Sequence, residues 1–191
     1  MCALDTSWSH DDLCLLTAKW VTGTSAERKR NDRYFGGKMQ AVVEMARQGE
    51  CCDVFAFGYW TTHLFEIKIS RSDYKRDAKK HWRKHGEGVG RNRWFVVPEG
   101  LITSDEVNDG WGLIYVTKKG QLQVVKASEH FESRQHLEEL NILRALLRRT
   151  GQDQRVFEFG KRADTTEKKS LAIDIQQNLA RFTSNQQINN Y

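Results

Sequence analysis

Apolar residues recur at two different spacings along the chain, and these spacings predict both helices and strands. In the first helical segment Leu13, Leu16 and Trp20 share one face, and two aspartates occupy the first turn, where the helix dipole stabilises them. Three segments show this spacing: residues 11–21, residues 72–84, which are rich in Lys and Arg, and residues 132–149, which carry a leucine stripe.

Short apolar or alternating runs predict the strands. Glycine and polar residues separate these runs, as expected for the connections between strands. The predicted strands are residues 39–46, 51–57, 63–70, 93–97, 111–117 and 121–126. The order of one helix, three strands, a basic helix, further strands and a last helix predicts an α/β fold with a mixed central β-sheet flanked by helices.

Three segments lack a clear apolar spacing. Residues 22–38 are polar, basic and interrupted by glycines, which predicts a loop, and residues 85–90 are glycine-rich, which predicts a flexible connection. Residues 151–191 are polar, with one helix predicted near residues 166–182 and fraying beyond it. We therefore predict a single domain over residues 1–150, with its core at about residues 39–126, and a polar, partly helical C-terminal extension over residues 151–191.

The composition of the 191 residues is that of a globular protein, with 39% hydrophobic and 29% charged residues. A chain of this length buries enough surface to fold without a disulfide framework, and its four cysteines form no C-x-x-C pair, which favours a reducing compartment. No run approaches the roughly 20 apolar residues of a membrane span, and the first residues lack the pattern of a secretory signal. These features predict a cytoplasmic protein that does not bind membranes.

Positive charge is concentrated in and after the second predicted helix. Between Arg71 and Arg93 there are nine Lys or Arg against three acids, whereas the whole chain has a net charge of +5. Such a segment suits a polyanion such as nucleic acid, although a solvated helix face explains the same charge equally well. Residues 28–38 add five Lys or Arg, against Asp32 alone.

Glu66 and Lys68 stand two residues apart in the third predicted strand, so strand alternation places them on one face, about 6–7 Å apart. A carboxylate and an ammonium on an otherwise apolar strand are costly unless they are paired or bind a metal. Asp53 begins the preceding strand, and a register that joins it to Glu66 would give two hard oxygen ligands for Mg²⁺. The pattern leaves that register open, and a cross-strand salt bridge is the simpler explanation of Glu-x-Lys alone.

Metal-assisted phosphodiester hydrolysis requires this combination of side chains. The carboxylates hold the metal, which stabilises charge on the phosphoryl oxygens and lowers the pKa of a bound water. Lys68 can position or deprotonate the attacking water, or stabilise the charge of the transition state. Glu44, in the first predicted strand, is a further carboxylate of the set.

Asp53, twelve intervening residues and then Glu66-Ile67-Lys68 resemble the core motif of the PD-(D/E)XK nuclease superfamily. The longer string FEIKISRSDY, residues 65–74, resembles small phage and bacterial members in which Glu-Ile-Lys-x-Ser-Arg-x-Asp-aromatic begins a basic helix. The resemblance extends over about residues 44–126 and includes residues 94–98 and 110–113. Cys52 stands where the superfamily usually has a proline.

The resemblance implies a restriction-endonuclease-like core and a Mg²⁺- or Mn²⁺-dependent nuclease that hydrolyses phosphodiester bonds, with DNA as the first expectation. It implies catalytic roles for Asp53, Glu66 and Lys68. The implied metal ligands are Asp53, Glu66 and the backbone carbonyl of Ile67. The first predicted helix offers aspartates but no glutamate, so Glu44 is the candidate third carboxylate. The implied location is the cytoplasm of a bacterial or phage-infected cell.

The start of the basic helix has a predicted role in binding phosphate. Ser70 or Ser72 can cap this helix, whose N-terminal N–H groups would then lie near the metal. Arg71 either reaches the same phosphate or pairs with Asp73 or Asp77. The helix and residues 28–38 are expected to flank the metal site. The candidate nucleic-acid contacts are Arg71, Lys75, Lys79, Arg83, Arg28, Lys29 and Arg30.

Other functions remain open at this level. A catalytically weak or inactive nuclease-fold protein could bind nucleic acid, and an interaction protein could present the basic helix to an acidic protein surface. The leucine stripe of residues 132–149 predicts a core face or an oligomer face, which leaves a homodimer open. Trp60 and Trp94 could stack on bases, although core packing is the usual role of Trp in strand-rich segments.

Overall fold

The computed structural model describes residues 8–23, 26–46, 51–78 and 88–150. The chain divides into one unit from Met1 to Thr150 and a second from Gly151 to Tyr191. The second unit, with the helix predicted near residues 166–182, lies outside the described residues. None of the helices in the described ranges is long and apolar enough to cross a membrane.

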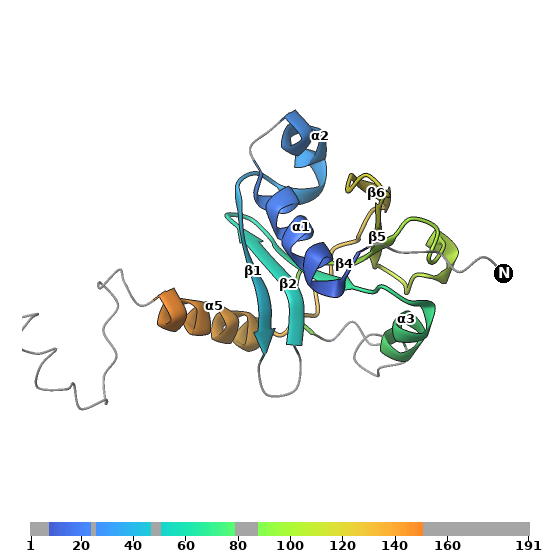
Figure 1. Ribbon diagram of the computed structural model, residues 1–191. Coiled ribbons are helices and arrows are strands. Elements are labelled where there is room, and N and C mark those ends of the chain that lie inside the picture. Colours follow the sequence, from blue (N-terminus) through green and yellow to red (C-terminus); the bar gives the residue numbers. More distant parts are fainter. Residues whose placement is uncertain (1–7, 24–25, 47–50, 79–87, 151–191) are drawn as a thin grey trace, which may run out of the picture. The chain divides into compact units, whose positions relative to one another are not determined.

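In the described part of the chain, six strands form one mixed sheet in the order β1-β2-β3-β4-β5-β6 (Figure 1). The three pairs β1–β2, β2–β3 and β5–β6 are antiparallel, and β3–β4 and β4–β5 are parallel. The strands are β1 Met39–Ala46, β2 Cys51–Gly58, β3 Thr62–Ile67, β4 Asn92–Pro98, β5 Gly112–Val116 and β6 Leu122–Lys126. The predicted strands and the mixed α/β class are confirmed.

The third strand is shorter than predicted, because β3 ends at Ile67 and the chain turns into a helix at Ser70. The Ser70 hydroxyl accepts the Asp73 N–H at 3.2 Å, and the Ser70 carbonyl accepts the Tyr74 N–H at 3.1 Å. A serine that caps a helix cannot also continue a strand.

Each of the three segments with helical apolar spacing contains a helix, and α2 is an additional one. The helices are α1 His10–Thr22, α2 Ala26–Phe35, α3 Arg71–Ala78 and α5 His136–Thr150, with a short 3-10 helix η1 at Ser104–Glu106. At the start of α1, Ser9 and Asp12 exchange side-chain to backbone hydrogen bonds in a capping box. The predicted basic helix is confirmed as far as Ala78, and residues 79–87 lie outside the described residues.

The prediction of a loop over residues 22–38 is wrong, because this segment contains α2. The sequence of α2 is polar, but Phe35 at its end is buried, with its ring centroid 5.1 Å from that of Trp20 and 5.7 Å from that of Trp94. Helical stability in proteins comes largely from such tertiary packing, which local polarity does not reveal. Gly36 and Gly37, with φ of 62° and 104°, end the helix.

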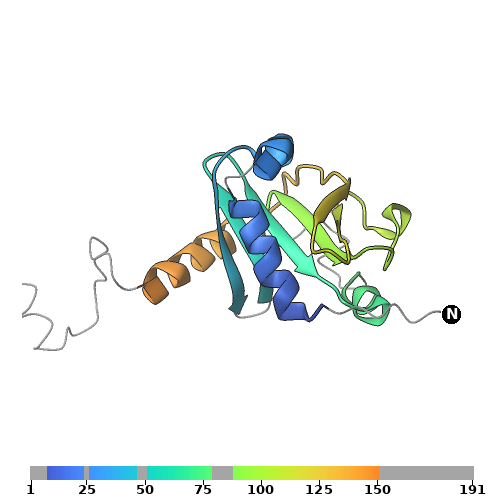
Figure 2. The same ribbon diagram turned by 45° about the horizontal axis from the view of Figure 1, so that its top comes forward.

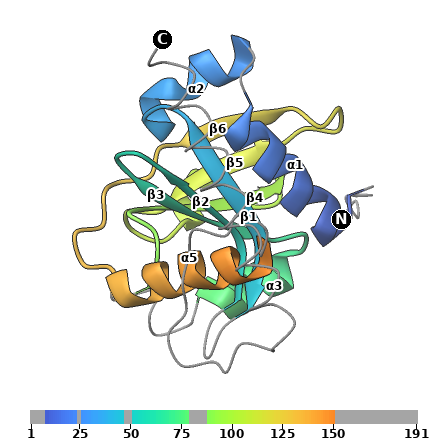
Figure 3. The same ribbon diagram turned by 90° about the vertical axis from the view of Figure 1, so that its left-hand side faces the viewer.

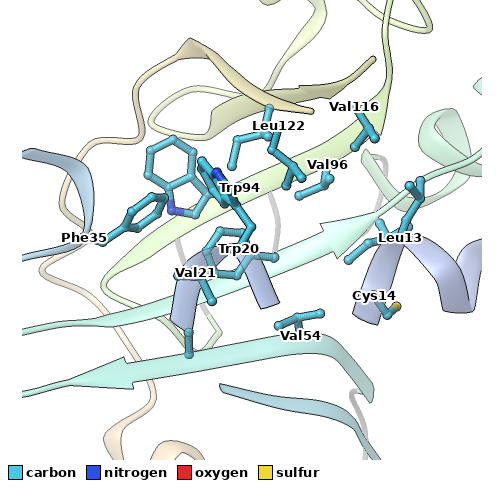
Figure 4. Close-up of a cluster of buried hydrophobic side chains, with 14 of the residues drawn as sticks. Leu13, Cys14, Trp20, Val21, Phe35, Val54, Trp94, Val96, Val116 and Leu122 are labelled. Carbon is cyan, nitrogen blue, oxygen red and sulfur yellow. The ribbon is translucent and has the colours of Figure 1, made fainter. Parts of the chain in front are cut away.

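Helices cover both faces of the sheet (Figures 2 and 3). On one face, α1 contributes Leu13, Cys14 and Val21 to a core with Val54 and Val96 (Figure 4). On the other face, α3 and α5 contribute Tyr74 and Ile142 to a second core whose sheet residues include Leu64, Phe95 and Leu113. The prediction of a sheet flanked by helices is therefore confirmed.

The leucine stripe of α5 is divided between core and surface. Ile142 is 3% exposed and Leu146 packs against the second core. By contrast Leu137, Leu140 and Leu147 are exposed by 75%, 60% and 52%. The sheet side of α5 includes Glu139, whose Oε1 accepts the Thr62 hydroxyl at 3.0 Å and the Gly90 N–H at 2.8 Å.

The end of the glycine-rich connection is held by a buried arginine. Arg93 is fully buried and donates to the backbone carbonyls of Gly88, Val89 and Gly90 at 3.0–3.1 Å. Gly90 has φ of 86°, and a Cβ there would lie 2.8 Å from the backbone nitrogen of Leu64, so a side chain does not fit. Residues 88–90 are thus fixed against β3, whereas residues 85–87 lie outside the described residues.

Candidate metal and nucleic-acid site

The register of β2 and β3 brings Asp53 beside the end of β3. Val54 pairs with Phe65, so the position opposite Asp53 is Glu66. Asp53 Oδ2 accepts the backbone N–H of Ile67 at 2.8 Å, which holds the carboxylate at the last residue of β3. The sequence left this register open, and the structure brings the two acids together.

Lys68 lies between these acids and a third one. Its Nζ is 3.0 Å from Glu66 Oε2, 3.8 Å from Asp53 Oδ2 and 4.0 Å from Asp77 Oδ1, the carboxylates within 4.0 Å of it among the described residues. Glu66, Lys68 and Asp77 are buried, and Asp53 keeps part of its side chain at the surface. Among the described residues, the cluster therefore has three carboxylates around one ammonium.

The charge state of Lys68 follows from its burial and from the three neighbouring carboxylates. Burial by itself lowers the pKa of the Lys68 ammonium, but the carboxylates of Glu66, Asp77 and Asp53 act in the opposite direction and prevail. The pKa is raised above its ordinary value, so Lys68 is a cation at neutral pH. A cation can stabilise developing negative charge or orient a water molecule.

A second group of possible ligand atoms adjoins Asp53 on the side of α1. One ligand atom each from His10, Asp11 and Glu44 lies within 4.8 Å of the others, and His10 Nε2 is 3.4 Å from Asp53 Oδ1. Glu44 lies between the paired positions Val43 and Met45 of β1 and has φ of 51°. A positive φ is uncommon for a residue with a side chain, so the backbone is strained at this point of the sheet.

The pKa of Cys14, a buried residue of α1, reflects the charge of both groups. Burial is the main cause that raises the pKa of this thiol to about 12, and the carboxylates of Asp53, Glu44, Asp11 and Glu66 add to it. Four acids from α1, β1, β2 and β3 therefore act on one point.

The donor set fits Mg²⁺ or Mn²⁺. These ions prefer carboxylate and carbonyl oxygens, which Asp53, Glu66 and the Ile67 backbone supply. The N–H and C=O of one strand residue face the same neighbouring strand. Since the Ile67 N–H donates to Asp53, the Ile67 carbonyl lies on the Asp53 side of β3.

Two members of the site were not predicted from the sequence. Asp77 was considered only as a partner for Arg71, although it lies three residues after the buried Tyr74 and thus on the same helix face. His10 directly precedes the two aspartates of α1, and its contact with Asp53 depends on how α1 packs on the sheet. Glu44 lies beside His10 and Asp11, whereas Asp77 lies beside Lys68.

Arg71 is engaged by the protein itself. It donates to the Leu101 carbonyl at 2.7 Å and forms a two-point ion pair with Glu106. Asp73, one of the partners considered for it, pairs with Arg76 at 2.9 Å. The Arg71 side chain is nevertheless 50% exposed, so a phosphate can still approach it.

The remaining basic candidates fall into two places. Lys75 is exposed on α3, and Lys79 and Arg83 lie outside the described residues. Arg28, Lys29 and Arg30 belong to α2, whose end packs near the β2–β3 turn, since a Cβ on Gly36 would lie 3.7 Å from Thr61 Cγ2. That turn is at the opposite end of the hairpin from Asp53. Of the two described basic segments, α3 adjoins the acidic cluster. The end of α2 lies away from the cluster, so residues 28–38 do not flank it as predicted.

Comparison with known proteins does not identify a function for the chain. No family model matches the chain, and no curated protein matches it. A solved structure described as "SPO1766 protein of unknown function from Silicibacter pomeroyi" is similar, with a TM-score of 0.49 and 15% sequence identity. The match covers 80% of this chain and 99% of that chain. The chemistry of the site's own side chains is therefore what points to a function.

Proposed function

We propose that the protein is a Mg²⁺- or Mn²⁺-dependent nuclease of the PD-(D/E)XK type, acting on DNA. The observation that carries the proposal is the meeting of Asp53, Glu66 and Lys68 at the end of β3. A structural salt bridge would need one acid for Lys68, whereas Asp77 and Asp53 join Glu66 around it. Three carboxylates gathered around one ammonium supply the hard oxygen ligands that a divalent cation prefers.

Each residue has a separate task in the proposed reaction. Asp53, Glu66 and the Ile67 carbonyl would hold the metal, which when bound stabilises charge on the phosphoryl oxygens and lowers the pKa of a water molecule. Lys68, oriented by Glu66, stabilises charge that develops on the phosphate or positions the attacking water. The Asp53 hydrogen bond to Ile67 keeps two of the ligands in register.

The elements around the site also support a nucleic-acid substrate. Helix α3 begins three residues after Lys68, so a phosphate near the ammonium would meet the positive end of the helix dipole. Lys75 is exposed on the same helix and can contact the backbone of a bound strand. The succession of helices α1 and α2, three strands, α3 and a parallel strand supports the restriction-endonuclease-like core that the motif implies.

The test is cleavage of plasmid and single-stranded DNA with Mg²⁺, Mn²⁺ or Co²⁺, with EDTA as the control. Asp53→Asn and Glu66→Gln keep side-chain shape but remove a ligand charge, and each should slow cleavage by roughly 10²-fold or more. Asp109→Asn changes an exposed acid away from the site and should cut as the wild type does.

Wild-type protein that binds DNA but cuts it with none of these metals would overturn the enzyme assignment. The alternative of an inactive nuclease-fold protein that binds nucleic acid would then replace it. Absence of both cleavage and binding would favour a protein partner for the basic helix.

A further inference from the structure

Two aromatic side chains are exposed together at the turn between β2 and β3. Tyr59 is 84% and Trp60 is 74% exposed, with ring centroids 4.5 Å apart and planes at 77°. Exposing the apolar surface of two such rings to water is unfavourable, and the exposed rings do not contribute to the core. Trp94, by contrast, is 1% exposed, so the usual core role applies to it and not to Trp60.

The turn that carries these rings is well supported. The Gly58 N–H donates to the Thr61 carbonyl at 2.9 Å, and the Thr61 hydroxyl donates to Asn92 Oδ1 at 3.1 Å. A Cβ on Gly58 would lie 2.9 Å from the Lys38 carbonyl, so the turn packs closely on the start of β1. A binding surface that is already ordered loses less entropy when its ligand arrives.

Exposed cations flank the aromatic pair. Met39 pairs with Gly58, so the exposed Lys38 lies at the strand end next to Tyr59. Arg33 is exposed in the last turn of α2. Gly36, which follows this helix, lies near Thr61, the residue after Trp60. Residues 30–38 carry three Lys or Arg against one acid. A protein partner would not need these cations, whereas aromatic rings among cations suit unpaired bases joined by phosphates.

We propose that the Tyr59–Trp60 turn stacks on the unpaired bases of single-stranded nucleic acid, with Arg33 and Lys38 contacting its phosphates. The inference rests on the proposed nuclease function. It specifies the substrate that reaches the metal site as a single strand or the frayed end of a duplex. Asp53 and Tyr59 are six residues apart along β2, about 20 Å at the usual strand rise. Single-strand-binding folds cover about 4–16 nucleotides, which is ample for this span.

The experiment compares fluorescein-labelled oligo(dT) with a blunt duplex of equal length by fluorescence anisotropy, in EDTA so that no cleavage occurs. Trp60→Ala should weaken oligo(dT) binding by roughly 5- to 150-fold, the range for loss of one base stack, and leave duplex binding unchanged. Trp60→Phe keeps a ring and should restore most of the affinity. Leu137→Ala removes an apolar side chain of 75% exposure on α5 and serves as the matched control.

An equal loss of affinity for both probes, or no loss, would overturn the inference. The inference would also be overturned if the wild type self-associates in sedimentation and Trp60→Ala is a monomer. The rings would then contact a second copy of the chain. The two proposals fail separately. Trp60-dependent oligo(dT) binding in a protein that never cuts DNA defeats the nuclease assignment alone. Metal-dependent cleavage with Trp60-independent binding defeats the stacking surface alone.

Discussion

Lys68 has two tasks that one substitution can separate. Its ammonium neutralises the buried carboxylates of Glu66 and Asp77, and in the proposed reaction it stabilises charge on the phosphate. Lys68→Met keeps most of the length of the side chain but removes the cation that these acids face. Removing one partner of a buried ion pair costs about 3–5 kcal/mol. The variant should therefore unfold at a lower urea concentration than the wild type.

The same variant should cut DNA about 10²–10⁴-fold more slowly in single-turnover assays. Its DNA affinity in filter binding should change far less, because the phosphate contacts lie elsewhere. Mn²⁺ should restore part of the lost stability, since a bound cation takes over the neutralisation. Lys118→Met, at an exposed turn, is the control. Cleavage by Lys68→Met at the wild-type rate would remove Lys68 from the mechanism.

Single residues of the site differ in how far the sequence could predict them. Asp53, Glu66 and Lys68 could be grouped because motif spacing and strand alternation are local properties. His10 and Asp77 reach the group only through the packing of α1 and α3 on the sheet, which no local pattern encodes.

Among the elements, α3 is fastened to the segment before β5 by contacts that involve Glu106. The carboxylate of Glu106 pairs with Arg71, and its backbone carbonyl accepts the Tyr74 hydroxyl. The Thr103 N–H and Arg71 lower the pKa of Glu106, so it is charged at neutral pH. A phosphate at the start of α3 must therefore compete with Glu106 for the Arg71 guanidinium.

Glu106→Gln removes this competitor. We expect DNA affinity to rise, and the plot of log affinity against log salt concentration to steepen by about 0.9, as one more phosphate is neutralised. Binding is measured in EDTA at several salt concentrations, with Glu129→Gln as the exposed control. An unchanged slope would mean that Arg71 serves only to tie α3 to η1.

The helices and strands also show where apolar periodicity is insufficient to predict an element. Strands β1 to β6 and helices α1 and α5 could be predicted because each carries an apolar face of regular period. Helix α2 has no such face, and Phe35 and Tyr34 anchor its end among the rings of Trp20 and Trp94. These rings come from distant parts of the chain, so the helix could not be foreseen from residues 22–38 alone.

At the scale of the whole molecule, the acidic cluster and the exposed Lys38 lie at different ends of the β2–β3 hairpin. Asp53 and Glu66 meet at one end, and Lys38 lies beside the turn at the other. This separation could not be predicted, because it follows from the hairpin register and from where α2 packs. In the proposed functions, one strand of nucleic acid would contact cations at the turn while one of its phosphates reaches the acidic end.

The folding equilibrium of the whole chain offers a test of the metal site that does not depend on activity. A ligand that binds only the folded state stabilises it by about 2.7 kcal/mol at 100 times its Kd. For a chain of this size, such a gain raises Tm by roughly 5–11 °C. We therefore expect Mn²⁺ to raise the Tm of the wild type by this amount in differential scanning calorimetry, and EDTA to reverse the rise.

Two substitutions decide which acids hold the ion. Asp53→Asn can still accept the Ile67 N–H through its amide oxygen, so the fold should persist while the Mn²⁺-dependent rise in Tm disappears. Asp11→Asn removes an exposed acid of the His10–Asp11–Glu44 group, and most of the rise should remain. The reverse result would move the cation to the α1 side of Asp53. In that case Lys68, which contacts Glu66 and Asp77 on the other side, would lose its proposed place beside the reacting phosphate.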